Sequence, residues 1–159
     1  LLATLLAIGS GYTLRSGAVR PRQLVWGIAI TTERESLYIE VAHNLAPFVS
    51  TETVVAAPEI GTLGYYLPAR ILDTAGLVSP EALLYLDPDL ARSSPLGHAI
   101  SPKLVEAYRP DYIVTLDVFA KALISSQTIG ENYDLIQVHP SCAFSSQRLL
   151  VYRERGSKR

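Results

Sequence analysis

The 159-residue sequence has little cysteine and histidine and no excess of charge of either sign. It holds one cysteine, Cys142, and histidines only at His43, His98 and His139. A disulfide needs two cysteines and a zinc site generally needs several Cys or His ligands close together, so we expect neither an intrachain disulfide nor a structural metal. Lysine and arginine number 14 against 15 acidic residues. No basic stripe is therefore expected, and nucleic acid is not an expected partner.

Methionine is absent, and the chain begins LLATLLAIGSGYTLRSG, where the first eight residues form an apolar run apart from Thr4. This run is shorter than the ~20 residues that cross a bilayer, but it has the form of the last third of a membrane span. We expect residues 1–22 to be the end of a truncated transmembrane helix followed by a basic linker. A buried helix of a soluble protein and a signal-peptide remnant are the alternatives. The length then suits one soluble domain at residues 23–154, followed by a charged, solvated tail at residues 155–159.

Strand-like runs alternate with helix starts along the predicted domain. Helices are expected to begin at about Glu33, Pro80, Pro102 and Val118. The first start follows a capping box, Thr32 with Glu35 three residues on, and the next two place a proline directly after a capping serine. Short apolar runs predict strands at residues 54–57, 71–73, 112–116, 135–138 and 149–152. The alternation predicts an α/β fold, a single layered domain with a mostly parallel or mixed sheet of about five strands covered by helices.

Carboxylates and tyrosines gather around the first two predicted strands. Glu59 and Asp73 each lie at the carboxyl end of a strand, where ligands bind in open α/β sheets. Carboxylates accept hydrogen bonds from sugar hydroxyls, and the ring of Tyr65 could stack on a sugar. In the structural alternative, which we favour, Glu59 caps the following turn and Asp73 anchors the loop before Gly76.

Other signals for chemistry are weak. The glycines of residues 61–64 form only G-x-x-G, so no nucleotide cofactor is expected. Residues 86–100 are expected to form a long irregular connection and the rim of a site, with His98 as a candidate binding or proton-carrying residue. A small hydrolase using His98 or Cys142 is a further hypothesis, but no third group completes a catalytic set. We therefore name no catalytic residue, and the binding candidates are Glu59, Tyr65, Asp73 and His98.

Three segments carry a resemblance to a known family. They are EIGTLGY at residues 59–65, ILDTAGL at 71–77 and PDYIV at 110–114. In this order they resemble the C-terminal soluble region of bacterial polytopic membrane glycosyltransferases, the group similar to protein O-mannosyltransferases and cell-wall arabinofuranosyltransferases. The resemblance covers about residues 25–155 and implies a small α/β domain that follows a bundle of membrane spans.

The resemblance also implies a function and a location. In this group the catalytic acids lie in external loops near the amino terminus of the whole enzyme. The chain is thus expected to be an accessory, non-catalytic, extracytoplasmic domain of an enzyme that uses a lipid-phosphate-linked sugar donor, with a glycan or glycolipid acceptor as partner. Arg15, Arg20 and Arg22 argue against this location, because the positive-inside rule places such residues on the cytoplasmic side of the membrane. A membrane-anchored carbohydrate-binding or ligand-binding module is the alternative.

Overall fold

The computed structural model describes residues 21–94 and 97–157, with side chains from residue 33 onward. The chain divides into two units, residues 1–32 and residues 33–159. Helix α2 (Pro21–Leu45) begins in the first unit and ends in the second. The membrane-helix end expected at residues 1–22 lies outside the described residues, except that residues 21 and 22 begin α2. Among the helices described, none combines the length and apolar character needed to cross a membrane.

Helix α2 differs from its prediction at its start. It begins at Pro21, so Thr32 and Glu35 lie inside the helix and do not form its cap. Proline is favoured at the first helical position, and no second proline follows before Pro47, so the backbone has no reason to stop at Thr32. A short 3-10 helix, η1 (Ala46–Phe48), then ends the helical segment.

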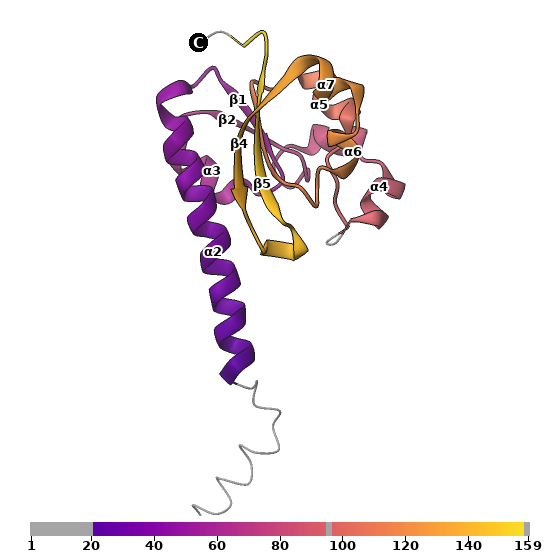
Figure 1. Cartoon of the computed structure of the whole chain (residues 1–159). Helices are drawn as coiled ribbons and strands as arrows, with labels where there is room; N and C mark the ends of the chain where they lie inside the picture. The colour runs from indigo at the N-terminus through magenta and orange to yellow at the C-terminus, as the bar shows by residue number, and fades with distance from the viewer. Residues whose placement is uncertain (1–20, 95–96, 158–159) are drawn as a thin grey trace, which may run out of the picture. The chain divides into compact units, whose positions relative to one another are not determined.

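The five strands form one sheet, as predicted. They are β1 (Val54–Ala57), β2 (Arg70–Asp73), β3 (Tyr112–Leu116), β4 (Tyr133–Pro140) and β5 (Arg148–Glu154), in the order β2-β1-β3-β5-β4 (Figure 1). Strand β1 runs parallel to β2 and β3, whereas β5 runs antiparallel to β3 and β4. The sheet is therefore mixed, and the expected α/β class is confirmed.

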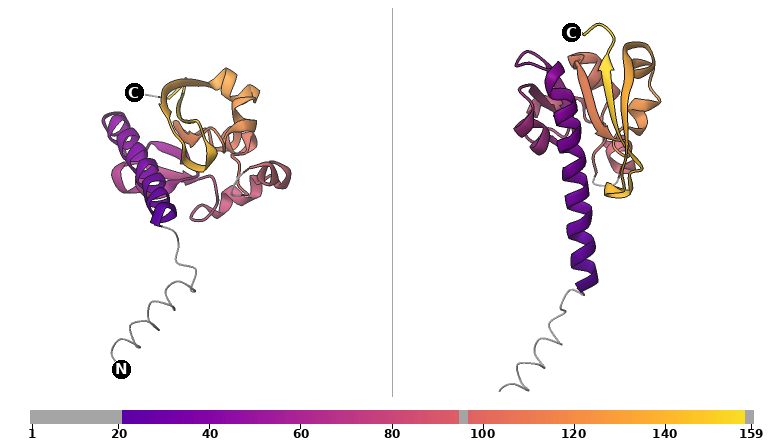
Figure 2. Two further views of the ribbon diagram at one scale, coloured as in Figure 1. Left: turned by 60° about the horizontal axis from the view of Figure 1, so that its bottom comes forward. Right: turned by 60° about the vertical axis from the view of Figure 1, so that its left-hand side comes forward.

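Helices cover both faces of the sheet in the unit formed by residues 33–159. On one face, here called the α2 face, the second half of α2 and helix α3 (Ile60–Tyr66) pack on Val55, Val114 and Val151. The other face packs Ala56, Ile113 and Leu150 against several short helices. These are η2 (Pro80–Tyr85), α5 (Pro102–Tyr108), α6 (Lys121–Ile124) and α7 (Gln127–Asn132). Figure 2 shows the strands between these two sets of helices.

Two connections differ from their predictions. The segment expected to be irregular contains helix α4 (Pro88–Ser93), because Asp87 caps it by accepting hydrogen bonds from the backbone N–H groups of Asp89 (2.9 Å) and Leu90 (3.3 Å). The helix expected from Val118 begins at Lys121 instead. A turn precedes it, in which the N–H of Ala120 donates to the carbonyl of Asp117 at 3.2 Å.

Candidate functional site

The parallel strands β1, β2 and β3 end at one edge of the sheet. The chain passes from β1 to β2 on one side and then crosses β1 to reach β3 on the other side. In open α/β sheets a ligand crevice lies beyond the carboxyl ends of the strands at such a change of direction. Glu59 follows β1, Asp73 ends β2 and Asp117 follows β3. These three acids therefore lie at the carboxyl edge of the sheet, where a ligand crevice is expected.

Asp73 holds the turn that follows β2. Its carboxylate is fully buried and accepts hydrogen bonds from the N–H groups of Ala75 (2.9 Å) and Val78 (2.8 Å). Its own N–H donates to the hydroxyl of Ser79 at 3.1 Å, so Ser79 serves this turn and does not cap η2. Gly76 takes a φ of 80°, a conformation that glycine adopts without strain. Asp73 therefore has the structural role predicted as one alternative, in which it anchors the loop before Gly76.

Glu59 does not have the structural role predicted for it, which was to cap the following turn. It precedes α3, but its side chain makes no capping hydrogen bond, so the expected cap is wrong. The carboxylate turns instead toward α2, where its Oε2 lies 3.2 Å from Nη1 of Arg34. Burial raises the pKa of the Glu59 carboxyl, and the positive charge of Arg34 only partly offsets this, so the pKa stays above its usual value.

Glu59 and Arg34 line a cavity of about 310 Å³, here called the α2–α3 cavity. Its lining is completed by Glu35, Tyr38, Ile39, Gly61 and Thr62. Tyr38 is only 2% exposed, and its hydroxyl has no hydrogen-bond partner among the described residues. A buried hydroxyl without a hydrogen-bond partner costs about 1–3 kcal/mol. Burial, with the nearby Glu59 carboxylate, also raises the pKa of Tyr38, so the phenol keeps its proton at neutral pH.

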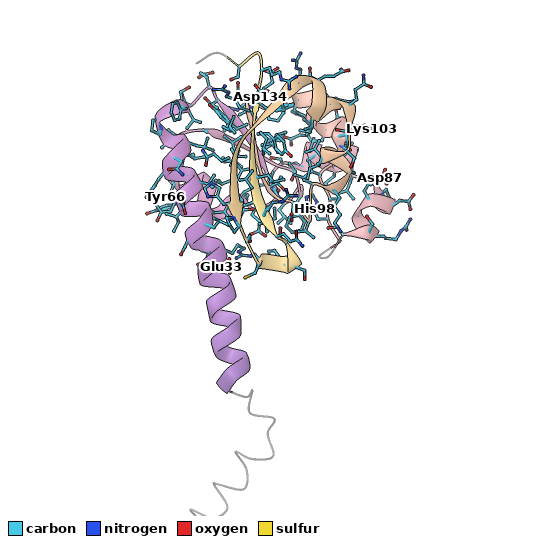
Figure 3. All side chains as sticks on the ribbon, viewed as in Figure 1. Glu33, Tyr66, Asp87, His98, Lys103 and Asp134 are labelled. Atoms are coloured by element: carbon cyan, nitrogen blue, oxygen red, sulfur yellow. The ribbon has the colours of Figure 1, made fainter. Side chains whose placement is uncertain are left out.

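Aromatic rings lie one helical turn farther along the same two helices. Tyr65 and Tyr66 follow the lining residues Gly61 and Thr62 by four positions, a rise of about 6 Å. Tyr66 makes edge-to-face contacts with His43 of α2 (centroids 5.4 Å apart) and with Tyr65 (4.9 Å). Tyr65 is 81% exposed. Figure 3 places Tyr66 beside α2.

His98 lies near Asp73 but does not line the α2–α3 cavity. Its Nε2 is 3.4 Å from the hydroxyl of Thr74, and its ring centroid is 5.9 Å from that of Phe119. Burial lowers the pKa of His98, and the charge of Asp73 raises it less, so the imidazole is neutral at physiological pH. The four predicted site residues thus separate into two places, with Glu59 and Tyr65 along α3 and Asp73 and His98 beyond β2.

Aromatic and cationic contacts lie between these two places. The ring of Phe119 is 6.0 Å from that of Phe144, and the guanidinium carbon of Arg34 lies 5.2 Å from the centroid of Phe144. A cation over an aromatic face is held by the quadrupole of the ring. Arg34 is therefore fixed from two sides, by Phe144 and by the Glu59 carboxylate.

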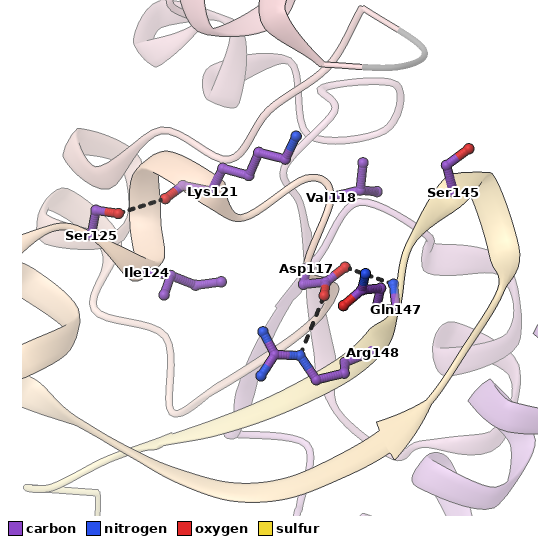
Figure 4. Close-up of a pocket in the computed structure, with 8 residues that line it drawn as sticks. All are labelled: Asp117, Val118, Lys121, Ile124, Ser125, Ser145, Gln147 and Arg148. Carbon is purple, nitrogen blue, oxygen red and sulfur yellow. Dashed lines mark hydrogen bonds and ion pairs between the residues drawn. The ribbon is translucent and has the colours of Figure 1, made fainter.

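A second cavity of this edge, of about 470 Å³, contains Asp117 (Figure 4). The carboxylate accepts hydrogen bonds from the Ser146 hydroxyl (2.5 Å), the Gln147 N–H (3.2 Å) and Nε of Arg148 (3.4 Å). Burial raises the pKa of Asp117, but these hydrogen bonds and the Arg148 charge outweigh it and hold the pKa below its usual value. Asp117 thus ties the β4–β5 connection to the end of β3. In Figure 4 the Lys121 side chain points away from this carboxylate.

The remaining candidates for chemistry make structural contacts. The Cys142 thiol donates to Glu33 at 2.6 Å, and this hydrogen bond raises the pKa of the thiol, so it is not an activated nucleophile. His139 contacts Gln137 at 3.0 Å and Glu40 at 3.6 Å. Within residues 21–94 and 97–157, no group of three or more His, Cys, Asp or Glu side chains could hold a metal ion.

Sequence reasoning missed Arg34, Tyr38 and Asp117. Arg34 and Tyr38 lie four residues apart, which puts them on one face of the predicted helix, but nothing in the sequence pairs that face with Glu59. Asp117 directly follows a predicted strand. The rule that directed attention to Glu59 and Asp73 could therefore have found Asp117.

Comparisons with known proteins add one match. The family model described as "Domain of unknown function (DUF8728)" matches residues 27–152. A search of curated proteins and a search of solved structures each give no significant match.

Proposed function

Because the chain belongs to this family, whose description names no activity, we propose its function from the geometry: a non-catalytic domain that binds a glycan in the α2–α3 cavity. The observation that carries the proposal is the buried Tyr38 hydroxyl, which has no partner among the described residues and lies beside Arg34 and Glu59. A carboxylate accepts hydrogen bonds from sugar hydroxyls, a guanidinium donates them, and a phenol does both. The volume of about 310 Å³ lies within the range of ligand sites, which begins near ~300 Å³.

The same contacts favour binding over catalysis. Asp73 and Asp117 have their carboxylates engaged by backbone and side-chain donors. In the cavity, Glu35 and Glu59 both lie close to the single guanidinium of Arg34, at 3.8 and 3.2 Å. Glycoside hydrolysis uses two carboxylates that flank the scissile bond, one of them free to protonate the leaving group or to attack. Because Arg34 lies close to both carboxylates, neither is free for that chemistry, and the three groups are better suited to orienting the hydroxyls of a bound sugar.

The aromatic side chains extend this interpretation. A sugar bound at Glu59 and Arg34 has the exposed Tyr65 ring about one helical turn away along α3. Aromatic faces pack on the apolar faces of ligand rings, and Tyr supplies a large contact area at low conformational cost. We therefore assign hydroxyl recognition to Arg34, Tyr38 and Glu59, and contact with a neighbouring sugar to Tyr65.

The wider setting proposed is the one that the three sequence segments imply. The domain would be an accessory, extracytoplasmic part of a membrane glycosyltransferase with a lipid-phosphate-linked sugar donor, and its ligand would be the acceptor glycan or glycolipid. In support, the three segments are neighbours in the fold. Residues 59–65 lead into α3, residues 71–77 span the end of β2 and its turn, and residues 110–114 lead into β3.

The test is isothermal titration of the 159-residue chain with neutral oligosaccharides of mannose, arabinose or galactose. Tyr38→Phe removes only the unpartnered hydroxyl, so it should weaken binding about tenfold, the effect of one hydrogen bond, while thermal stability stays equal or rises. Tyr85→Phe, on the other face of the sheet, is the matched control and should change neither quantity. Equal affinity in Tyr38→Phe, the absence of any oligosaccharide binding, or release of free sugar from the ligand would each refute the proposal.

A further inference from the structure

A separate cavity lies at the opposite edge of the sheet, beside the amino ends of β1 and β3. Its volume is about 760 Å³, and it is lined by Pro47, Phe48, Val49, Ser50, Thr53, Tyr112 and Arg153. In the register of the sheet, Arg153 of β5 pairs with Tyr112 of β3 and with Asp134 of β4. Figure 3 shows Asp134 at the end of the sheet away from His98 and Glu33, so this cavity is distinct from the glycan site.

Arg153 is the chemical centre of this cavity. Its side chain is partly buried and makes no ion pair or hydrogen bond with any residue in the described part of the chain. The acid paired with Arg153 in the sheet and the acid next to it in sequence are already engaged: Asp134 by Nε of Arg155 at 2.9 Å, and Glu154 by Arg109 at 2.6 Å. A guanidinium presents five N–H donors and accepts none, so Arg153 requires an anionic or polar acceptor from elsewhere.

The cavity has one apolar wall and one wall with hydroxyl groups. Pro47, Phe48 and Val49 form an apolar wall, and Phe48 is 69% exposed although it lines a cavity. Ser50 and Thr53 supply hydroxyls, which also bond within their own turn, where the Ser50 N–H donates to Thr53 Oγ1 at 2.9 Å. The cavity therefore combines one cation with an apolar surface of the kind that a ligand body covers.

We propose that this cavity binds a small organic carboxylate, with the carboxylate on the Arg153 guanidinium and an aromatic or aliphatic body against Phe48. The planar fork of a guanidinium matches a carboxylate in two parallel hydrogen bonds. The lining residues carry one cation and no lysine, which suits a ligand with a single negative charge better than a phosphate dianion. Inorganic anions have no apolar surface to bury against the apolar wall, so this wall favours a ligand with a hydrophobic body.

The experiment titrates the 159-residue chain with benzoate and follows binding by calorimetry and by NMR shifts of the residue 47–53 amides. Benzoate should bind at one site. Three other probes should each bind about tenfold more weakly than benzoate. Benzamide lacks the negative charge, acetate lacks the ring, and inorganic phosphate lacks the planar carboxylate that matches the guanidinium. Tighter binding of phosphate than of benzoate, equal binding of benzamide, or no benzoate binding would overturn the proposal.

Two variants locate the site. Arg153→Gln should weaken benzoate binding about tenfold or more, as expected for a lost charge-assisted hydrogen bond. Phe48→Ala changes an exposed side chain and so should keep the fold, while removing the preference for benzoate over acetate. The control is Arg92→Gln, an exposed arginine that pairs with Asp89 on α4 and should leave benzoate affinity unchanged. Unchanged benzoate affinity in either Arg153→Gln or Phe48→Ala would refute the assignment.

Discussion

Replacing Asp73 by asparagine tests whether this residue at the carboxyl edge stabilises the fold or binds a ligand. The Asp73 carboxylate is fully buried and receives the N–H groups of Ala75 and Val78, one on each oxygen. Asparagine keeps one acceptor oxygen but turns its NH₂ group toward the second N–H. One charge-assisted hydrogen bond is lost, and a backbone donor is left without an acceptor. We expect a loss of about 3 kcal/mol in the free energy of unfolding, at the upper end of the about 1–3 kcal/mol that an unsatisfied buried donor costs, because the remaining hydrogen bond also loses the charge of its acceptor.

The assay is thermal and urea-induced unfolding of the full chain, followed by circular dichroism. For a chain of this size, 1 kcal/mol shifts Tm by about 2–4 °C, so Asp73→Asn should melt about 6–12 °C below the wild type. The urea midpoint should fall while the slope m stays constant, because the surface exposed on unfolding does not change.

The matched variant is Glu59→Gln. Its carboxyl has a raised pKa, so the folded protein disfavours the charged form, and the neutral amide should cost less than about 1 kcal/mol despite the lost contact with Arg34. Glu59→Gln should instead weaken oligosaccharide binding. If Asp73→Asn changes stability by less than about 0.5 kcal/mol, a typical effect for a surface substitution, the structural role assigned to Asp73 is wrong.

Two further predictions concern backbone strain and pH. Gly76→Ala should destabilise by about 1–2 kcal/mol, because φ is 80° and the new Cβ would lie 2.5 Å from Leu83, whereas Gly130→Ala in α7 meets nothing within 4 Å and should be neutral or stabilising by up to about 1 kcal/mol. Equal melting temperatures for these two variants would contradict the strain argument. The folded pKa of Asp117 lies below its unfolded value, so its stabilisation is present above about pH 4 and is lost as the pH falls through the lowered pKa. The stability difference between wild type and Asp117→Asn should therefore shrink between about pH 5 and 2, and a difference that stays constant over that range would refute it.

Local patterns in the sequence were enough to predict the sheet. Strands β1 and β3 have the predicted bounds, because runs buried on both faces are continuously apolar and end sharply at polar or turn residues. The turn after Asp73 was also predictable, since its donors lie within the next five residues. The errors at Pro21 and Pro88 were local as well, because each of these prolines carried a helix-start signal that was not used.

The tertiary structure alone decided which side chains meet. Arg34 joins Glu59, and Arg153 faces the same cavity as Phe48, because helix α2 packs on one face of the sheet and the register of β5 sets which residues share that face. Side chains alternate between the faces of a strand, so a shift of one residue would have turned Arg153 to the opposite side. The sequence by itself determined the elements and their local turns, through contacts between neighbours along the chain. The α2–α3 cavity and the Arg153 cavity depend on contacts between distant segments, which only the packing of helix on sheet determines.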